Sequence, residues 1–156
     1  MQQQAYETTS TINGAGMRFA IVGSEWYGEA VDSMIAAAKQ LLESAQVAPQ
    51  DLDIFHVPGS LEIPVLCSHL IAKRKYDGII AFGIIVQGDT YHHQMMIDTI
   101  VSSFTRITLD TGVPILNEIL AVKDQSAVAS RTTGAGNKGF EAAQAALKIA
   151  AVLRGL

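Results

Sequence analysis

Short apolar runs alternate along this chain with longer segments whose apolar residues recur every three or four positions. The short runs, rich in β-branched residues, predict buried strands, and the longer segments predict helices. In the first helical segment this spacing is carried by Ala30, Met34, Ala37, Ala38, Leu41 and Leu42. The expected strands span 17–22, 51–57, 78–83 and 115–122, and the expected helices span 25–46, 61 onwards, 91–108, 125–130 and 137–153.

Regular alternation of strands and helices indicates the fold class. Parallel strands need crossover connections, and helices usually supply them, so the pattern predicts an α/β fold with an open parallel sheet covered by helices on both faces. Turn residues at Pro58-Gly59 and within 110–114 separate the expected elements. With no repeat or linker, we expect one domain over 17–156, preceded by a flexible polar arm at 1–16.

Composition excludes several classes of protein. The chain has 156 residues, of which 49% are hydrophobic and 17% charged, enough for a core that folds without disulfides. Its only cysteine, Cys67, falls in an apolar helical pattern and is expected to be a buried thiol, as in a reducing cytoplasm. A net charge of -4, with no basic cluster beyond Lys73-Arg74-Lys75, argues against nucleic acid as a partner. No apolar run approaches the roughly 20 residues that span a bilayer, and no signal peptide is expected.

The segment 83–93 carries the most informative candidate chemistry. Gly88, Asp89, Thr90 and His92 follow the third expected strand and precede a helix. The first N–H groups of a helix have no partner inside it, and the macrodipole favours negative charge there. Such a place binds a phosphate or carboxylate readily, and a histidine beside it is a candidate proton carrier.

Loops after the other strands bring further candidates to the same edge of the sheet, where ligands of open α/β sheets bind. Trp26 follows the first strand and Glu62 follows the second. Each also has a structural interpretation, since a Trp that opens a helix is often a packing anchor and a first-turn acid complements the macrodipole. Their expected convergence with His92 favours a binding site.

The glycine-rich piece 132–139 leaves two interpretations open. As structure, it is a turn between two helices, with Asn137 capping the second. As function, its amides and Lys138, with Arg131 just before it, could hold an anion. It is not a Walker A loop, because its spacing differs and it follows a helix instead of a strand.

Four segments carry a resemblance to a known family. They are 57–64 (Val-Pro-Gly-Ser-Leu-Glu-Ile-Pro), 83–92, 111–114 (Thr-Gly-Val-Pro) and 135–139 (Ala-Gly-Asn-Lys-Gly). In order and spacing they resemble the lumazine synthase family, over about residues 17–153. The resemblance implies a flavodoxin-like three-layer α/β/α sandwich with a four-stranded parallel sheet. It also implies pentamers, sometimes twelve in a hollow shell, with active sites between adjacent subunits, and riboflavin synthase as a candidate partner.

The family's reaction condenses 5-amino-6-ribitylamino-2,4-pyrimidinedione with 3,4-dihydroxy-2-butanone 4-phosphate to 6,7-dimethyl-8-ribityllumazine, without a metal or cofactor. The resemblance assigns proton transfer to His92 and stacking on the pyrimidine to Trp26. The remaining expected ligands are Ser60, Leu61 and Glu62 for the ribityl chain, Ile84, Ile85 and Val86 for the pyrimidine pocket, Asp89 and Thr90 for phosphate, and, from a neighbouring subunit, Asn117, Arg131 and Lys138.

Several positions differ from the family's pattern. Gln87 stands where arginine is frequent, Tyr91 where proline is common, and His93 where an aromatic is usual, so His93 is expected to pack instead of facing the ligand. The carboxylate of Asp89 is expected to turn away from phosphate and cap the helix, leaving its N–H for the anion. The family's phosphate-binding arginine lies eight residues before the lysine, a position held here by Ser130. Either Arg131 reaches the site from the next position, or Lys138 and helix amides bind the phosphate.

Two other classes of protein share parts of this pattern. A flavodoxin-like binding module or a signalling receiver could share the fold, but 23–27 (Gly-Ser-Glu-Trp-Tyr) provides neither a glycine-rich nucleotide loop nor the acidic pair of a phospho-receiver. A shell protein without activity would explain the altered arginine, but not the presence of Trp26, Glu62, His92 and Lys138. Residues 133–138 show no insertion, which favours a shell over free pentamers under the resemblance.

Overall fold

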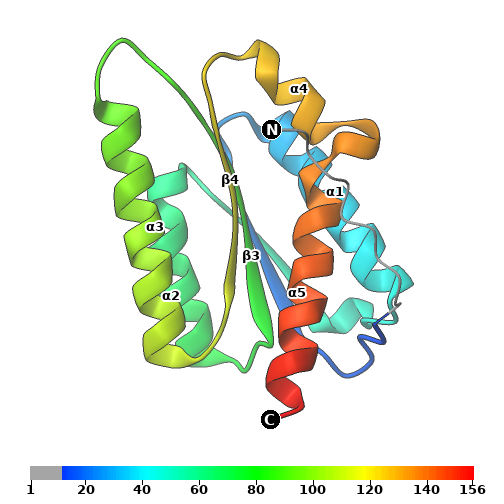
Figure 1. Cartoon of the computed structure of the whole chain (residues 1–156). Coiled ribbons are helices and arrows are strands. Elements are labelled where there is room, and N and C mark those ends of the chain that lie inside the picture. The colour runs from blue at the N-terminus through cyan, green and yellow to red at the C-terminus, as the bar shows by residue number, and fades with distance from the viewer. Residues whose placement is uncertain (1–11) are drawn as a thin grey trace.

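The computed structural model describes residues 12–156, which form a three-layer α/β/α sandwich (Figure 1). Its sheet has four parallel strands in the order β2-β1-β3-β4. The strands are β1 (Phe19–Ser24), β2 (Leu52–Val57), β3 (Gly78–Val86) and β4 (Ile115–Val122). The helices are α1 (Gly28–Ser44), α2 (Ile63–Lys73), α3 (His92–Thr111), α4 (Ser126–Thr132) and α5 (Lys138–Arg154), with 3-10 turns at Pro49–Asp51, Ser60–Glu62 and Gly134–Gly136. The predicted fold class is confirmed.

Strand β3 differs most from its predicted length. It continues three residues past Gly83 to Val86, because Ile84, Ile85 and Val86 pair in register with the end of β4. Gly83 therefore lies inside a strand, where it gives room to a neighbouring side chain: a Cβ there would lie 2.4 Å from Ser60 Oγ. Strand β4 has the bounds expected from the sequence.

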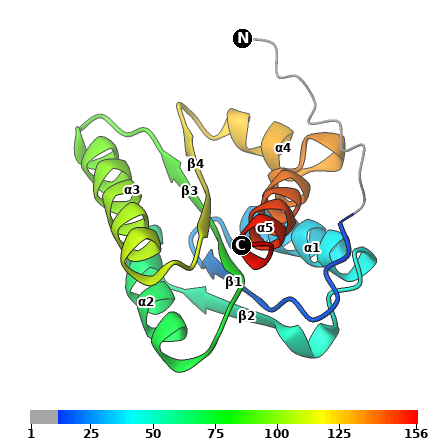
Figure 2. The same cartoon turned by 60° about the horizontal axis from the view of Figure 1, so that its bottom comes forward.

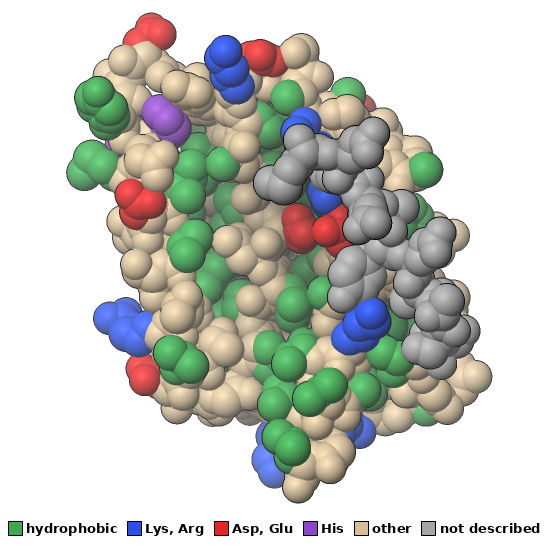
Figure 3. Space-filling model, in the orientation of Figure 1, with side chains coloured by type: hydrophobic (Ala, Val, Ile, Leu, Met, Phe, Trp, Pro, Cys, Tyr) green, Lys and Arg blue, Asp and Glu red, His purple; other side chains and the backbone are tan. Residues whose placement is uncertain are grey.

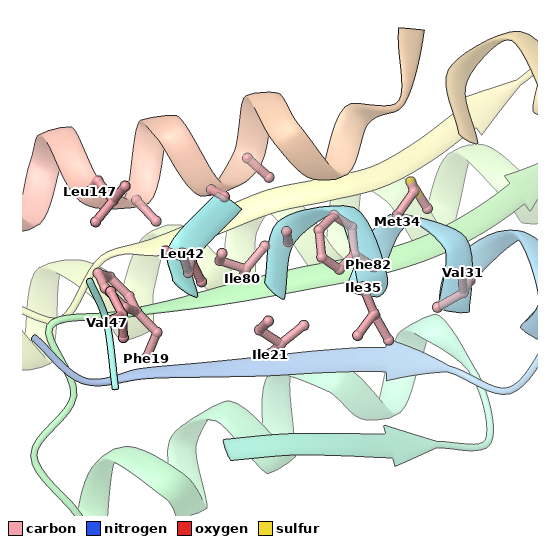
Figure 4. Close-up of a cluster of buried hydrophobic side chains, with 14 of the residues drawn as sticks. Phe19, Ile21, Val31, Met34, Ile35, Leu42, Val47, Ile80, Phe82 and Leu147 are labelled. Atoms are coloured by element: carbon pink, nitrogen blue, oxygen red, sulfur yellow. The ribbon is translucent and has the colours of Figure 1, made fainter. Parts of the chain in front are cut away.

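Two helical layers cover the sheet, as two views show (Figures 1 and 2). Helices α2 and α3 lie on one face, and α1, α4 and α5 lie on the other. Because side chains alternate along a strand, β3 feeds both cores: Ile79 and Ala81 join the α2/α3 side, while Ile80 and Phe82 join the α1/α5 side. Figure 4 shows Ile80 and Phe82 together with Leu42 of α1 in this second core.

Helices α1 and α5 approach each other closely where α5 begins. A Cβ at Gly139 would lie 2.1 Å from Met34 O and 2.9 Å from Ala37 Cβ, so only glycine fits there. Apart from Leu147, the other buried residues of α5 are alanines: Ala142, Ala143, Ala146 and Ala150. This agrees with the close packing that the alanine-rich pattern predicts.

Charged side chains gather at the amino ends of the strands, opposite the edge where the predicted ligands lie. Asp53 accepts hydrogen bonds from Tyr76 Oη at 2.7 Å and from Arg74 at 2.9 Å. Burial and the bond to Asp53 raise the pKa of Tyr76 to about 12. Burial alone would raise the pKa of Asp77, but hydrogen bonds from Arg154 and the Arg18 N–H outweigh it and lower that pKa. This network fixes the end of the sheet remote from the candidate site.

Two further expectations concern Cys67 and the chain's beginning. Cys67 is fully buried in α2, as expected, and burial raises its pKa to about 12. Residues 1–11 of the expected arm lie outside the described residues. Gly14, near the end of the expected arm, is buried and donates its N–H to Ala45 O at 2.7 Å, so packing begins before Met17. None of the helices within residues 12–156 has the length and hydropathy needed to cross a membrane.

Candidate active site

A pocket of about 350 Å³ opens at the carboxyl ends of β1 and β3. This is the place where open parallel sheets bind their ligands. Seven of the thirteen predicted site residues line it, and they come from three separate segments of the chain. They are Trp26, Ser60, Leu61, Glu62, Ile84, Ile85 and Val86, joined by Tyr27, Gly59 and Met96.

The aromatic and acidic parts of the pocket meet over Gly59. A Cβ at Gly59 would lie 2.9 Å from Glu62 Oε2 and 3.7 Å from Trp26 Cδ1, so the glycine leaves space for both side chains. Trp26 is 71% exposed, which rules out the packing-anchor interpretation within this chain. Glu62 does not cap α2 with its side chain. An exposed indole and a carboxylate are therefore available side by side to a ligand.

The wall of the pocket formed by β3 is apolar and packs closely against its neighbours. Ser60 is buried, and its Oγ lies against Gly83, so the 3-10 turn Ser60–Glu62 packs against the strand. Ile84 and Ile85 are buried and Val86 is half-buried. Such a wall suits the flat face of an unsaturated ring, because binding removes apolar surface from water.

Helix α3 begins at His92, after a segment that leaves β3 at Val86. Its N-cap residue is Tyr91, whose own side chain makes no capping hydrogen bond. The prediction that Asp89 caps the helix is wrong, because α3 starts one residue later than expected and Asp89 then precedes the cap position by two. Thr90 Oγ1 is the acceptor instead, at 3.4 Å from the His92 N–H. The other early N–H groups of this 20-residue helix remain available to an anion.

The two histidines at the start of α3 have different surroundings. The His93 ring is half-buried, and its Nδ1 lies 2.9 Å from Thr90 O, a contact that requires Nδ1–H. The His92 ring is exposed and has no hydrogen-bond partner within residues 12–156. Met96, which lines the pocket, lies one helical turn after His92 on the same face. His92 itself does not line the pocket.

Asn117 lies away from this pocket, on edge strand β4. It borders a different groove, of about 260 Å³, between β4 and α3. The other residues of this groove are apolar or hydroxyl side chains, including the exposed Val101 and Leu109. Asn117 is exposed, and its Oδ1 accepts the Ile119 N–H at 3.1 Å.

Arg131 and Lys138 also lie outside the pocket. They belong to α4 and α5, on the face of the sheet opposite to α3 and its groove at Asn117. Arg131 is in the last turn of α4, where Nη1 donates to Ala127 O at 2.9 Å. Lys138 is the first residue of α5, and its Nζ lies 2.5 Å from Glu141 Oε2. Both sequence-based alternatives for the phosphate therefore stay predictions: Arg131 reaches it, or Lys138 and helix amides bind it.

Glu118 of β4 is a charged neighbour of Lys138 that sequence reasoning missed. Burial and the nearby Glu141 carboxylate raise its pKa to about 7, and Lys138 opposes this shift. The alternation of side chains along β4 indicates its position, because Glu118 lies on the same face of the strand as Leu116 and Leu120, which pack toward α5. Tyr27 was also missed, and it adopts the left-handed conformation with φ of 57° where α1 begins.

A larger groove, of about 720 Å³, lies between α1 and α4 and contains none of the predicted site residues. Most of its lining residues are small or carry a hydroxyl, with Glu29 and Gln125 among the others, and it shares Tyr27 with the pocket beside Trp26. Seven of the predicted site residues line the smaller pocket and none lines this groove, so we assign the candidate site to the smaller pocket. Residues 12–156 contain no group of three His, Cys, Asp or Glu side chains that could hold a metal ion.

Comparison with known proteins adds independent information. A family model described as 6,7-dimethyl-8-ribityllumazine synthase matches residues 16–154. The 6,7-dimethyl-8-ribityllumazine synthase of Stenotrophomonas maltophilia (strain R551-3) is 36% identical over 140 residues, covering 89% of this chain and 90% of that protein. The proteins of the same name from Xylella fastidiosa (strain 9a5c) and Azoarcus sp. (strain BH72) are 37% and 34% identical, covering 93% and 95% of this chain and 95% and 93% of theirs.

Proposed function

The chain belongs to the 6,7-dimethyl-8-ribityllumazine synthase family, and we propose that its active site is the pocket beside Trp26, completed by a second copy of the chain. As a member of this family of cofactor-independent transferases, it condenses 5-amino-6-ribitylamino-2,4-pyrimidinedione with 3,4-dihydroxy-2-butanone 4-phosphate. The products are 6,7-dimethyl-8-ribityllumazine, phosphate and water, in riboflavin biosynthesis.

The pyrimidine fits the apolar and aromatic part of the pocket. Its ring stacks on Trp26 and lies against the β3 wall of Ile84 to Val86. The ribityl hydroxyls then reach the Ser60–Glu62 turn, where the Glu62 carboxylate accepts their hydrogen bonds. The observation that carries this placement is the exposed indole next to a carboxylate, with Gly59 leaving space for both at a strand end.

The butanone phosphate binds beside the first turn of α3. The unpaired N–H groups after Thr90 face its phosphate, and the helix dipole stabilises the negative charge. His92 lies at the same point, where the amine attacks the ketone and a carbinolamine must lose water. We assign to His92 the transfer of these protons, because its ring is exposed and free of other hydrogen bonds among the described residues.

We propose a second subunit because a single chain does not bring all the predicted substrate-binding residues together. Asn117, Arg131 and Lys138 lie at the β4 edge and beyond it, so they can complete only the pocket of a neighbour. Hydrophobic side chains are exposed between the two helical layers on the side of the β4 edge (Figure 3), in agreement with a surface that packs against another copy. The neighbour's cations would then oppose the α3 amides across the phosphate.

The proposed size of the assembly is the one that the family resemblance implies. We propose a homopentamer, with a 60-subunit shell as its larger form and riboflavin synthase as a candidate partner. Its place would be the cytoplasm, in agreement with the reduced, buried Cys67. Sedimentation velocity and electron microscopy of the purified protein test this: a monomer that forms lumazine would contradict the shared site.

The proposed role of His92 is tested by lumazine formation from both substrates. Replacement His92→Ala should lower kcat by about 10²- to 10⁴-fold, the usual contribution of a positioned proton carrier. The control is His69→Ala, which removes an exposed histidine of α2 whose Nδ1 lies 2.8 Å from Val65 O in the same helix. Equal rates for His92→Ala and the parent would remove His92 from this role, and no product from the parent would contradict the activity itself.

A further inference from the structure

Asn137 is a buried polar residue that joins three helices. Its Nδ2 lies 2.7 Å from Thr132 O in α4, and 3.2 Å from both Ser33 O and Ser33 Oγ in α1. Its Oδ1 accepts the Gly139 N–H at 2.8 Å and thereby caps α5. The side chain uses both its donor and acceptor groups, and the residue is only 7% exposed.

The partners of Asn137 are the immediate neighbours of the two cations assigned to phosphate. Thr132 follows Arg131, and Lys138 lies between Asn137 and Gly139. One carboxamide therefore holds the end of the helix that carries Arg131 and the start of the helix that carries Lys138. Between them the chain turns tightly, because a Cβ at Gly136 would lie 2.5 Å from Ser130 O.

Ser33 extends this arrangement to α1. Its Oγ donates to Thr132 O at 2.6 Å, so the same carbonyl accepts bonds from Ser33 and from Asn137. Since Gly139 packs directly on Met34 O, the first turn of α5 is held against α1 from two sides. Figure 1 shows α1, α4 and α5 meeting at this end of the layer.

We propose that Asn137 is a positioning residue for catalysis, which sets Arg131 and Lys138 at the separation required to grip one phosphate, and that Ser33 supports it. The inference rests on the proposed phosphate role of these two cations. Asn137 touches no substrate: it acts by preventing α4 and α5 from moving relative to each other. Preorganised cations bind an anion more tightly, because little ordering is left to occur on binding.

The main variant is Asn137→Ser, because serine still caps α5 by accepting the Gly139 N–H but cannot bridge to Thr132 O and Ser33 O. We expect the KM for the butanone phosphate to rise about tenfold or more, since small misplacements of binding groups are costly. The KM for the pyrimidine should change less than twofold, roughly the noise of the measurement for an unperturbed site. Inorganic phosphate, used as a competitive inhibitor, should weaken in parallel.

Ser33→Ala provides a milder second variant, which decides the question if Asn137→Ser does not fold. It should raise the same KM by a smaller factor and leave the pyrimidine KM unchanged. Its control is Ser44→Ala, on the same helix, where the hydroxyl bonds only to Leu41 O. Loss of active protein through misfolding would lower kcat without changing the ratio of the two KM values.

A double-mutant cycle separates positioning from a general structural role. In a Lys138→Ala background, Asn137→Ser should have a much smaller effect on the phosphate KM, because one of the groups that it positions is absent. If the parent forms lumazine but the effects of the two substitutions are fully additive, the inference is wrong. It is also wrong if both KM values change equally. An inactive parent would instead overturn the proposed function.

Discussion

Glu118 makes the stability of the fold depend on pH in a calculable way. Its carboxyl is half-buried on β4, and no hydrogen bond within residues 12–156 ties it. Burial, with help from Glu141 and against the effect of Lys138, raises its pKa from 4.5 to about 7. The folded state therefore holds this proton more tightly than the unfolded state does.

The sign and size of the effect follow from linkage. Between about pH 4.5 and pH 7 the folded protein binds more protons than the unfolded chain, so the free energy of unfolding falls as pH rises through this window. A shift from 4.5 to about 7 corresponds to at most about 3 kcal/mol at 1.36 kcal/mol per unit. Because the group is partly exposed, solvent screening reduces this, and we expect about 1–2 kcal/mol.

Glu118→Gln should remove this dependence, since glutamine resembles the protonated form. Urea unfolding followed by circular dichroism, at one fixed protein concentration, gives the free energies at about pH 5 and about pH 8. The variant should match the parent near pH 5 and exceed its stability by about 1–2 kcal/mol near pH 8. Glu29→Gln, an exposed acid in the first turn of α1, is the control for lost charge. A difference that stays constant from about pH 5 to pH 8 would refute the account of Glu118.

Two further predictions concern the glycine-rich region. Arg131→Ala should raise the KM for the butanone phosphate by about tenfold to a hundredfold, the value of a charge-assisted hydrogen bond, and leave the pyrimidine KM nearly unchanged. An unaltered phosphate KM would favour the alternative that Lys138 and helix amides bind the anion. Gly139→Ala should lower the free energy of unfolding by about 3 kcal/mol or more in urea, because its Cβ would meet Met34 O at 2.1 Å. Gly88→Ala, with no atom within 4 Å of the added Cβ, is the matched control and should be nearly neutral.

Hydrophobic periodicity was sufficient to predict the layers of the fold. The segment 110–114 placed the start of β4 correctly, because a helix-ending glycine and a proline precede a continuous apolar run. At Gly83 the same reasoning ended β3 too early. Glycine usually interrupts a strand, and its actual role, making room for Ser60 Oγ, depends on a residue far away in sequence.

Prediction of the candidate site was limited by what local patterns contain. Strand-end position was enough to bring Trp26 and Glu62 to one pocket, as expected. The cap of α3 depended on the helix boundary, which patterns locate only within a few residues, and Asp89 was misassigned for that reason. The raised pKa of Glu118 depends on burial between β4 and α5 and on Glu141, which no local pattern contains.

Arg154 links the end of the last helix to the segment that precedes β1. Its guanidinium donates to Gly16 O at 2.8 Å and to both carboxylate oxygens of Asp77, so the last helix ends beside the segment that leads into β1. Gly16 and Arg154, 138 residues apart in the chain, therefore lie close together. A circular permutant, in which these two ends are joined and the chain is opened elsewhere, should therefore fold into the same sandwich.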